Sequence, residues 1–247
     1  MSVWIPYRML SSDMEILNLF ILDSLVKPLT CIFSIFIAEG FKLPALRDLG
    51  LVREKAFFSF LKGLIVTSFA WFFGFLLTPY LLYGSYTLKI EEDLLKIAVL
   101  SANFILVSGP VEEILFRGYI LGQARLALGE GRLKLLAAIT FSSFLFSLSH
   151  LPIHVFVWKS GFFTTLLSVF FAFVIGHLLA LIYLATGNLL GAIVAHTEWN
   201  ILHAFIDIEE LSTFHSHGLA LVVFAFVFAL ASLSLYYLSN QRVVAES

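Results

Sequence analysis

Long uninterrupted runs of apolar residues are the feature that most restricts how this chain can fold. A helix needs about 20 mostly apolar residues to cross the hydrocarbon core of a bilayer. Seven stretches have this character, at residues 13–39, 57–84, 93–127, 133–157, 161–186, 188–206 and 217–239. Charged residues make up 13% of the chain, whereas a soluble domain carries about a quarter. The sequence therefore predicts an integral membrane protein.

The apolar runs are continuous and do not alternate with polar residues, which favours helices over the strands of an outer-membrane barrel. Two stretches leave the number of crossings open. The first contains Lys27 and Pro28 and is compatible with a hairpin of two short helices. The third is longer than one crossing requires and contains Gly109–Pro110, where a proline can split a helix. We predict an all-α bundle of seven or eight transmembrane helices that forms a single domain over residues 1–247.

The loops between these stretches differ in charge. Residues 40–56 and 125–134 together hold seven Lys and Arg residues, whereas residues 207–216 hold three acidic residues and no Lys or Arg. Cytoplasmic loops of membrane proteins are enriched in Lys and Arg. We therefore expect a multi-pass protein of the cell membrane with a cytoplasmic C-terminus. The N-terminus then lies outside for seven crossings and inside for eight.

The net charge of −2 provides no basic surface, so membrane lipid is an expected partner and nucleic acid is not. The single cysteine, Cys31, excludes an internal disulfide and leaves the fold to helix packing.

Three ionisable groups lie inside the third apolar stretch, in the motif Glu112-Glu113-x-x-x-Arg117. Each is costly to bury in a membrane. Glu113 and Arg117 are four residues apart on a helix and can neutralise each other as a structural ion pair. Glu112 points about 100° away from Glu113 on a helix and is left without that partner. A buried carboxylate of this kind suits a general base.

Two further motifs lie on other stretches. Phe146 precedes His150 by four residues, which is typical of an aromatic ring packed beside an imidazole, and His196 and Asn200 share one face at the same spacing. Taken singly, each motif is also compatible with plain helix packing, because polar side chains join membrane helices by hydrogen bonds. No role follows for four more polar residues, Glu198, His154, His177 and His203.

Polar groups on three separate apolar helices predict one polar intramembrane cavity, which is by default a functional site. Glu112 and His150 there would activate a water molecule, and His196 and Asn200 would donate hydrogen bonds to the oxyanion formed on a peptide carbonyl. The sequence lacks the His-Glu-x-x-His, aspartyl-pair and Gly-x-Ser-x-Gly motifs of other intramembrane proteases. Among intramembrane proteases, this exclusion favours a glutamate-and-histidine peptidase.

The ordered motifs "EEILFR" at 112–117, "FSLSH" at 146–150 and "HTEWN" at 196–200 resemble the type II CAAX prenyl endopeptidases, also called the CPBP or Abi family of glutamate-dependent intramembrane proteases. The motif-bearing core spans about residues 93–206. The resemblance implies a peptide or lipidated protein substrate, in some members a prenylated CAAX C-terminus. The residues that it implies for catalysis are Glu112, His150, His196 and Asn200, and those in supporting positions are Glu113, Arg117 and Phe146.

Three alternatives stay open from the sequence. Glu112, His150 and His196 are also a possible zinc ligand set, although we expect no cofactor because an Asn beside His196 suits an oxyanion site better. The same three residues would serve as a proton relay in a transporter. A non-enzymatic scaffold, in which the polar groups only lock helices together, is the third. The natural substrate, the lateral opening for it and the oligomeric state do not follow from the sequence.

Overall fold

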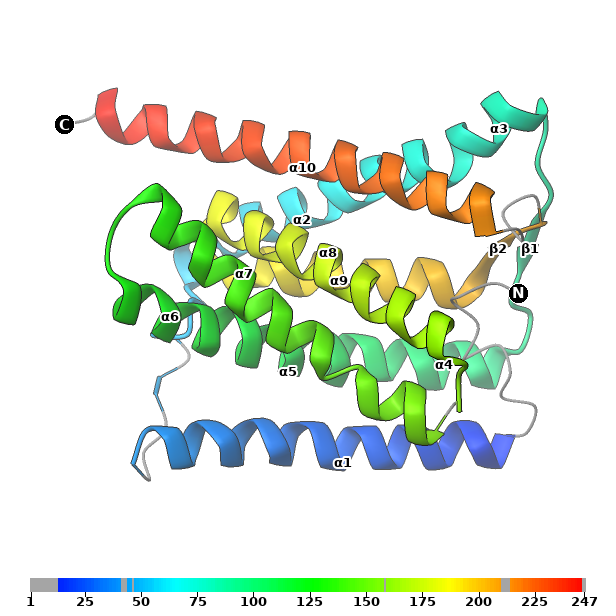
Figure 1. Ribbon diagram of the computed structural model, residues 1–247, viewed down its shortest axis with the longest axis horizontal. Helices are drawn as coiled ribbons and strands as arrows, with labels where there is room; N and C mark the ends of the chain where they lie inside the picture. Colours follow the sequence, from blue (N-terminus) through cyan, green and yellow to red (C-terminus); the bar gives the residue numbers. More distant parts are fainter. Residues whose placement is uncertain (1–12, 41–43, 46, 158, 210–213, 246–247) are drawn as a thin grey trace.

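The computed structural model describes residues 13–40, 44–45, 47–157, 159–209 and 214–245. Within these residues seven helical runs alternate in direction along the long axis of the molecule (Figure 1). Their α-helices are α1 (Asp13–Ala38), α2 (Ala56–Trp71), α3 (Thr78–Tyr83), α4 (Leu94–Asn103), α5 (Gly109–Glu113), α6 (Leu121–Leu128), α7 (Arg132–Leu148), α8 (Phe162–Thr186), α9 (Leu189–Phe205) and α10 (Phe214–Ala245).

Wider π-helical turns join several of these helices into longer ones. Residues Phe72–Leu77 connect α2 to α3, Phe104–Ser108 connect α4 to α5, and Ile114–Ile120 connect α5 to α6. The run over residues 94–128 is therefore one continuous helix across Gly109–Pro110, and the alternative of two segments is wrong. The π-helical turn Phe104–Ser108 ends two residues before Pro110, and such a local adjustment accommodates the missing N–H without breaking the helix.

Each predicted stretch contains a helix, and the all-α membrane bundle is confirmed. The first stretch is the single helix α1, which contains Pro28 and is not a hairpin. Five helices of the described chain are long and apolar enough to cross a membrane, beginning at Arg53, Leu94, Arg132, Phe162 and Gly218. The apolar part of α1, Ser24–Ala38, and the helix α9 are shorter. The number of crossings stays a prediction.

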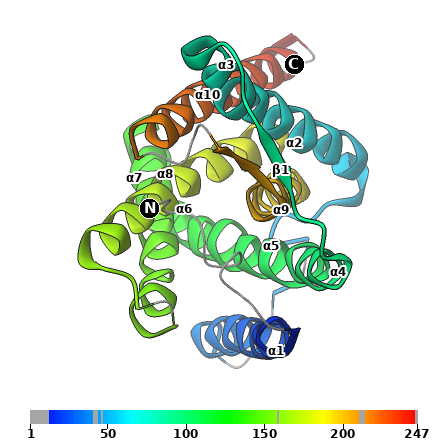
Figure 2. The ribbon, with the colours of Figure 1, turned by 90° about the vertical axis from the view of Figure 1, so that its right-hand side faces the viewer.

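Two short strands, which the sequence did not indicate, pair at one end of the bundle (Figure 2). Strand β1 (Leu88–Ile90) runs antiparallel to β2 (Ile206–Ile208), with Lys89 opposite Asp207. This ladder ties the connection before α4 to the end of α9. Just beyond β1, the Lys96 ammonium lies 2.6 Å from the Glu91 carboxylate and lowers the pKa of Glu91.

The largest part of the core lies between α2, α8, α9 and α10, where Trp71, Leu179, Trp199 and Phe224 are buried. Helix α1 lies apart from this core and packs along the run of residues 94–128 (Figure 1). That run is thus sandwiched between α1 on one side and α9 on the other. Both glutamates of the first motif lie in α5, inside this sandwich.

Candidate functional site

The site begins with a fully buried ion pair in the run of residues 94–128. The Arg117 guanidinium lies 2.8 Å from Glu113 Oε1, and both side chains are 0% exposed. The guanidinium also donates to the carbonyl of Gly176 on α8 at 3.0 Å and lies 4.3 Å from the centre of the Phe146 ring. The pairing predicted from the four-residue spacing is present. Its additional contacts link the run to α7 and α8.

Glu113 also holds a histidine. His196 of α9 lies with Nδ1 2.8 Å from Glu113 Oε1, so one carboxylate oxygen joins Arg117 and His196. The other ring nitrogen, Nε2, lies 3.9 Å from Glu112 Oε2. The sequence paired Glu113 with Arg117 only. Its contact with His196 was missed because a contact between two helices leaves no spacing signal.

Glu112 is not without a partner, and this corrects the expectation from the sequence. The Lys27 ammonium of α1 lies 2.7 Å from Glu112 Oε1. Isolated charges are costly in an apolar medium, and opposite charges on neighbouring helices pair. The signal was visible in the sequence as a lysine within the first apolar stretch. No local spacing connects it with α5.

Lys27 is part of a short series of hydrogen bonds between polar side chains. Lys27 Nζ donates to Ser108 Oγ at 3.0 Å, and the Ser108 hydroxyl donates to Asn103 Oδ1 at 2.7 Å. Ser108 and Asn103 are both buried in the run that carries Glu112. These two residues are further members of the site that sequence reasoning missed.

The second and third motifs reach the same place. The Phe146 ring packs edge-on against His150 at 4.8 Å and against His196 at 5.8 Å, so the predicted packing of Phe146 beside an imidazole is present. His150 Nδ1 lies 2.9 Å from the carbonyl oxygen of Phe146, to which it donates. Asn200 lies one turn beyond His196 on α9 and is half-buried.

The polar residues without an assigned role lie elsewhere. Glu198 accepts a hydrogen bond from Ser68 of α2. His203 packs on Trp199 and Phe75, 3.7 and 4.7 Å between ring centres. His177 contacts Thr140 of α7 at 3.2 Å. His154 is buried near Ser160 in the turn after α7. These side chains serve contacts between helices and turns around the site.

The three residues considered as zinc ligands, Glu112, His150 and His196, are not brought together as a ligand group in the structure. Among the residues that the structure describes, no group of three or more His, Cys, Asp and Glu side chains is placed to hold a metal ion. In the set considered for zinc, Glu112 Oε1 is bonded to the Lys27 ammonium, so a second cation there would meet a positive charge at short range.

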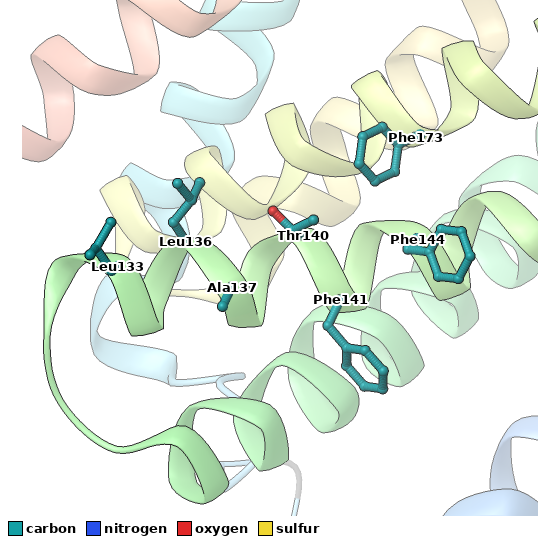
Figure 3. A pocket seen from close by; sticks show the side chains of 7 residues that line it. All are labelled: Leu133, Leu136, Ala137, Thr140, Phe141, Phe144 and Phe173. Atoms are coloured by element: carbon teal, nitrogen blue, oxygen red, sulfur yellow. The ribbon is translucent and has the colours of Figure 1, made fainter.

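An apolar groove of about 590 Å³ lies on α7 and α8 but does not include the site (Figure 3). Its lining residues are Leu133, Leu136, Ala137, Thr140, Phe141, Phe144 and Phe173. In α7 these residues occupy a different stripe from Phe146, which faces the buried ion pair. The groove is therefore a feature of the outer face of the bundle.

The fold and the site together define a class: a multi-pass membrane protein whose helical bundle encloses adjacent glutamates, an arginine and two histidines. Residues 94–202 match the family model described as type II CAAX prenyl endopeptidase Rce1-like. This match confirms the resemblance that the three motifs carry, and the matched family is one of proteases. Comparison with curated proteins and with solved structures finds no match.

Proposed function

We propose that the protein is an intramembrane endopeptidase that hydrolyses a peptide bond with a water molecule activated by Glu112 and His150. The single observation that carries this proposal is the meeting of the three motifs: His196 Nε2 lies 3.9 Å from Glu112 Oε2, and the Phe146 ring packs against both His196 and His150. The family match over residues 94–202 supports the same reaction class.

The side chains of the two adjacent glutamates differ in solvent exposure, and this difference assigns them different roles. The Glu112 side chain is 15% exposed, whereas Glu113 is fully enclosed between Arg117 and His196. A general base must reach the proton that it removes. Glu112 is therefore the base, and Glu113 holds its two partners in place.

The tautomers of the two histidines follow from their partners. A carbonyl oxygen only accepts, so His150 carries a proton on Nδ1, and its Nε2 accepts a hydrogen bond from water when the ring is neutral. Glu113 likewise requires a proton on His196 Nδ1. To donate from Nε2 as well, His196 must be the imidazolium.

The reaction then runs without a covalent enzyme intermediate. The water gives its proton to Glu112 Oε2, and its oxygen attacks the peptide carbonyl carbon. The carbonyl oxygen becomes an oxyanion that accepts hydrogen bonds from His196 Nε2 and the Asn200 amide. The bond from carbon to nitrogen breaks, and Glu112 returns the proton to the leaving amine. We propose that no metal takes part, because the cation beside Glu112 is Lys27.

For the substrate we propose the C-terminus of a prenylated protein that ends in a CAAX sequence, because the matching family model is that of the CAAX prenyl endopeptidases. Such a substrate is anchored in the bilayer by its prenyl chain. We place the protein in the cell membrane with the C-terminal end of α10 in the cytoplasm. The long basic loops support this orientation.

The test uses purified protein in detergent and a quenched fluorescent peptide that ends in a prenylated CAAX sequence. Removing a general base typically costs 10²–10⁴-fold in rate, so we expect Glu112→Gln to lower kcat/KM at least about 100-fold. Glu92→Gln is the matched control, because Glu92 is an exposed carboxylate in the connection before α4. Its activity is expected to equal that of the wild type.

The melting temperatures of all three proteins must agree before their rates of cleavage are compared. Full activity in a stable Glu112→Gln variant would remove Glu112 from the mechanism. If wild type cleaves neither the prenylated peptide nor its unprenylated counterpart, the peptidase proposal fails, and proton transport through the same residues becomes the next reaction to test.

A further inference from the structure

Lys27 is the one member of the polar cluster described here that comes from outside the residues matched to the family, 94–202. Its helix α1 precedes that segment and packs along it. A lysine in an apolar stretch is expensive unless its charge is compensated. The family match therefore does not explain why a lysine occupies residue 27, and the explanation must come from the contacts of Lys27 in this protein.

The face that α1 turns toward the run of residues 94–128 is defined by a repeat of four. Lys27 contacts Glu112 and Ser108, Cys31 lies 3.8 Å from the carbonyl oxygen of Val111, and Ile35 is buried. One turn further, Glu39 accepts a hydrogen bond from the Tyr119 hydroxyl at 2.8 Å. Residues spaced by four lie on one helix face. Lys27 is thus aimed at the site by the packing of the whole helix.

The contacts of Lys27 also fix which oxygen of Glu112 is available. Oε1 is bonded to the ammonium at 2.7 Å, whereas Oε2 faces His196 Nε2 at 3.9 Å, beyond a direct hydrogen bond. The ammonium is itself held by Ser108, whose hydroxyl is bonded to Asn103. A carboxylate anchored through one oxygen cannot rotate freely, so the other oxygen keeps its direction.

We infer that Lys27 is the positioning residue of the catalytic base: it anchors Glu112 through Oε1, compensates its charge, and directs Oε2 toward the water between Glu112 and the histidines. This inference rests on the proposed function, because it assigns Glu112 the role of base. It adds that α1, outside the family segment, completes the site. Without the lysine, the carboxylate loses its hydrogen-bonded cation and with it a fixed orientation.

The test compares Lys27→Ala with wild type in the peptide-cleavage assay. Misplacing a catalytic group by about 1 Å costs about 100-fold in rate, so we expect kcat to fall by about that factor while KM changes little. Adding propylammonium to Lys27→Ala restores a cation of matching length, and we expect it to recover activity at least several-fold. Lys89→Ala, at an exposed lysine of β1, serves as the control for unspecific effects of the amine.

Two more variants distinguish loss of the charge at residue 27 from loss of folding. Lys27→Met keeps the length without the charge and is expected to be as impaired as Lys27→Ala, whereas Lys27→Arg keeps a cation and is expected to retain more activity than either. Rescue of activity by the added amine is the result that a purely structural lysine would not produce.

The outcomes separate the inference from the function on which it rests. Lys27 variants that are as active as wild type, or more active, would show that the ammonium does not assist Glu112 and would overturn the inference alone. Loss of activity that propylammonium does not restore would also overturn it, because the lysine would then act only on the fold. Should wild type cleave no peptide, or Glu112→Gln remain active, the proposed function fails first and the inference falls with it.

Discussion

Arg117 is the largest fully buried side chain among the described residues, and its three contacts show what one residue contributes to the site. The guanidinium bonds to Glu113 on its own helix, bonds to the carbonyl of Gly176 on α8 and stacks on Phe146 of α7. A planar group with several N–H donors can make these contacts at once, and a lysine ammonium cannot. Arg117 thereby fixes Glu113, which in turn holds His196.

We predict that Arg117→Lys destabilises the protein although the charge is kept. A lysine retains the ion pair with Glu113 but loses the hydrogen bond to Gly176 and the stacking on Phe146. These losses amount to about 2–3 kcal/mol, and the melting temperature should fall by about 5–10 °C. Thermal unfolding in detergent measures this shift. Arg125→Lys, at an exposed arginine of α6, is the matched control and should melt like the wild type. Equal melting of both variants would contradict the network described for Arg117.

At this scale the sequence indicated most of the residues but few of the contacts between helices. The pair of Glu113 with Arg117 and that of Phe146 with His150 lie within one helix or its end, where a spacing of four is visible. The bonds of Glu112 to Lys27 and of Glu113 to His196 join separate helices. Such contacts depend on how helices pack, which one sequence does not encode as a spacing. The catalytic roles of Glu112, His150, His196 and Asn200 remain predictions.

Among the elements, α9 is the one whose position matters most, because it carries His196 to the glutamates. It packs closely on α2 where two glycines meet: a Cβ at Gly63 would run into the backbone carbonyl oxygen of Gly191. Small residues allow this close approach of membrane helices. The backbone oxygen cannot turn away, so any side chain at residue 63 must push α2 and α9 apart.

We therefore predict that Gly63→Ala lowers both stability and activity. Overpacking of this kind costs about 1–3 kcal/mol, more than the helix propensity that alanine gains over glycine, about 1 kcal/mol. A displaced α9 also moves His196 away from Glu112, so kcat/KM should fall more than the melting temperature alone suggests. The control is Gly122→Ala in α6, where a Cβ meets no atom within 4 Å. That variant should be at least as stable as wild type, and a Gly63→Ala variant that behaves in the same way would disprove the close crossing.

The elements themselves were largely predictable, because each of the seven apolar stretches contains a helix. The sequence left two questions, and both concerned prolines. Pro28 lies within α1 and Pro110 follows a π-helical turn, so neither divides its helix. A proline shows that a helix loses one hydrogen bond, but tertiary packing decides whether the helix ends there. The strands β1 and β2 were missed because each has three residues, too few for an alternating pattern.

Across the whole molecule, charge is distributed between the two ends of the bundle. The connection from α1 to α2 and the turn from α6 to α7 lie at the end where α10 finishes (Figure 1). These segments hold most of the basic loop residues, among them Arg47, Arg53 and Arg132. The opposite end holds β1 and β2, with Glu91, Glu92, Asp93 and Glu209 in or next to them. Loops distant in sequence therefore join into a basic end and an acidic end, as the charge pattern of the sequence predicted.

This polarity predicts the orientation of the protein, and single cysteines measure it. In a Cys31→Ser background, Glu92→Cys marks the acidic end and Glu130→Cys marks the turn from α6 to α7 at the basic end; both positions are exposed. Because basic loops stay in the cytoplasm, a membrane-impermeant maleimide should label Glu92→Cys in intact cells and Glu130→Cys only after permeabilisation. Glu112 lies near the middle of the run of residues 94–128 that joins the two ends. If only Glu130→Cys were labelled in intact cells, the protein would have the opposite orientation, with the C-terminal end of α10 outside.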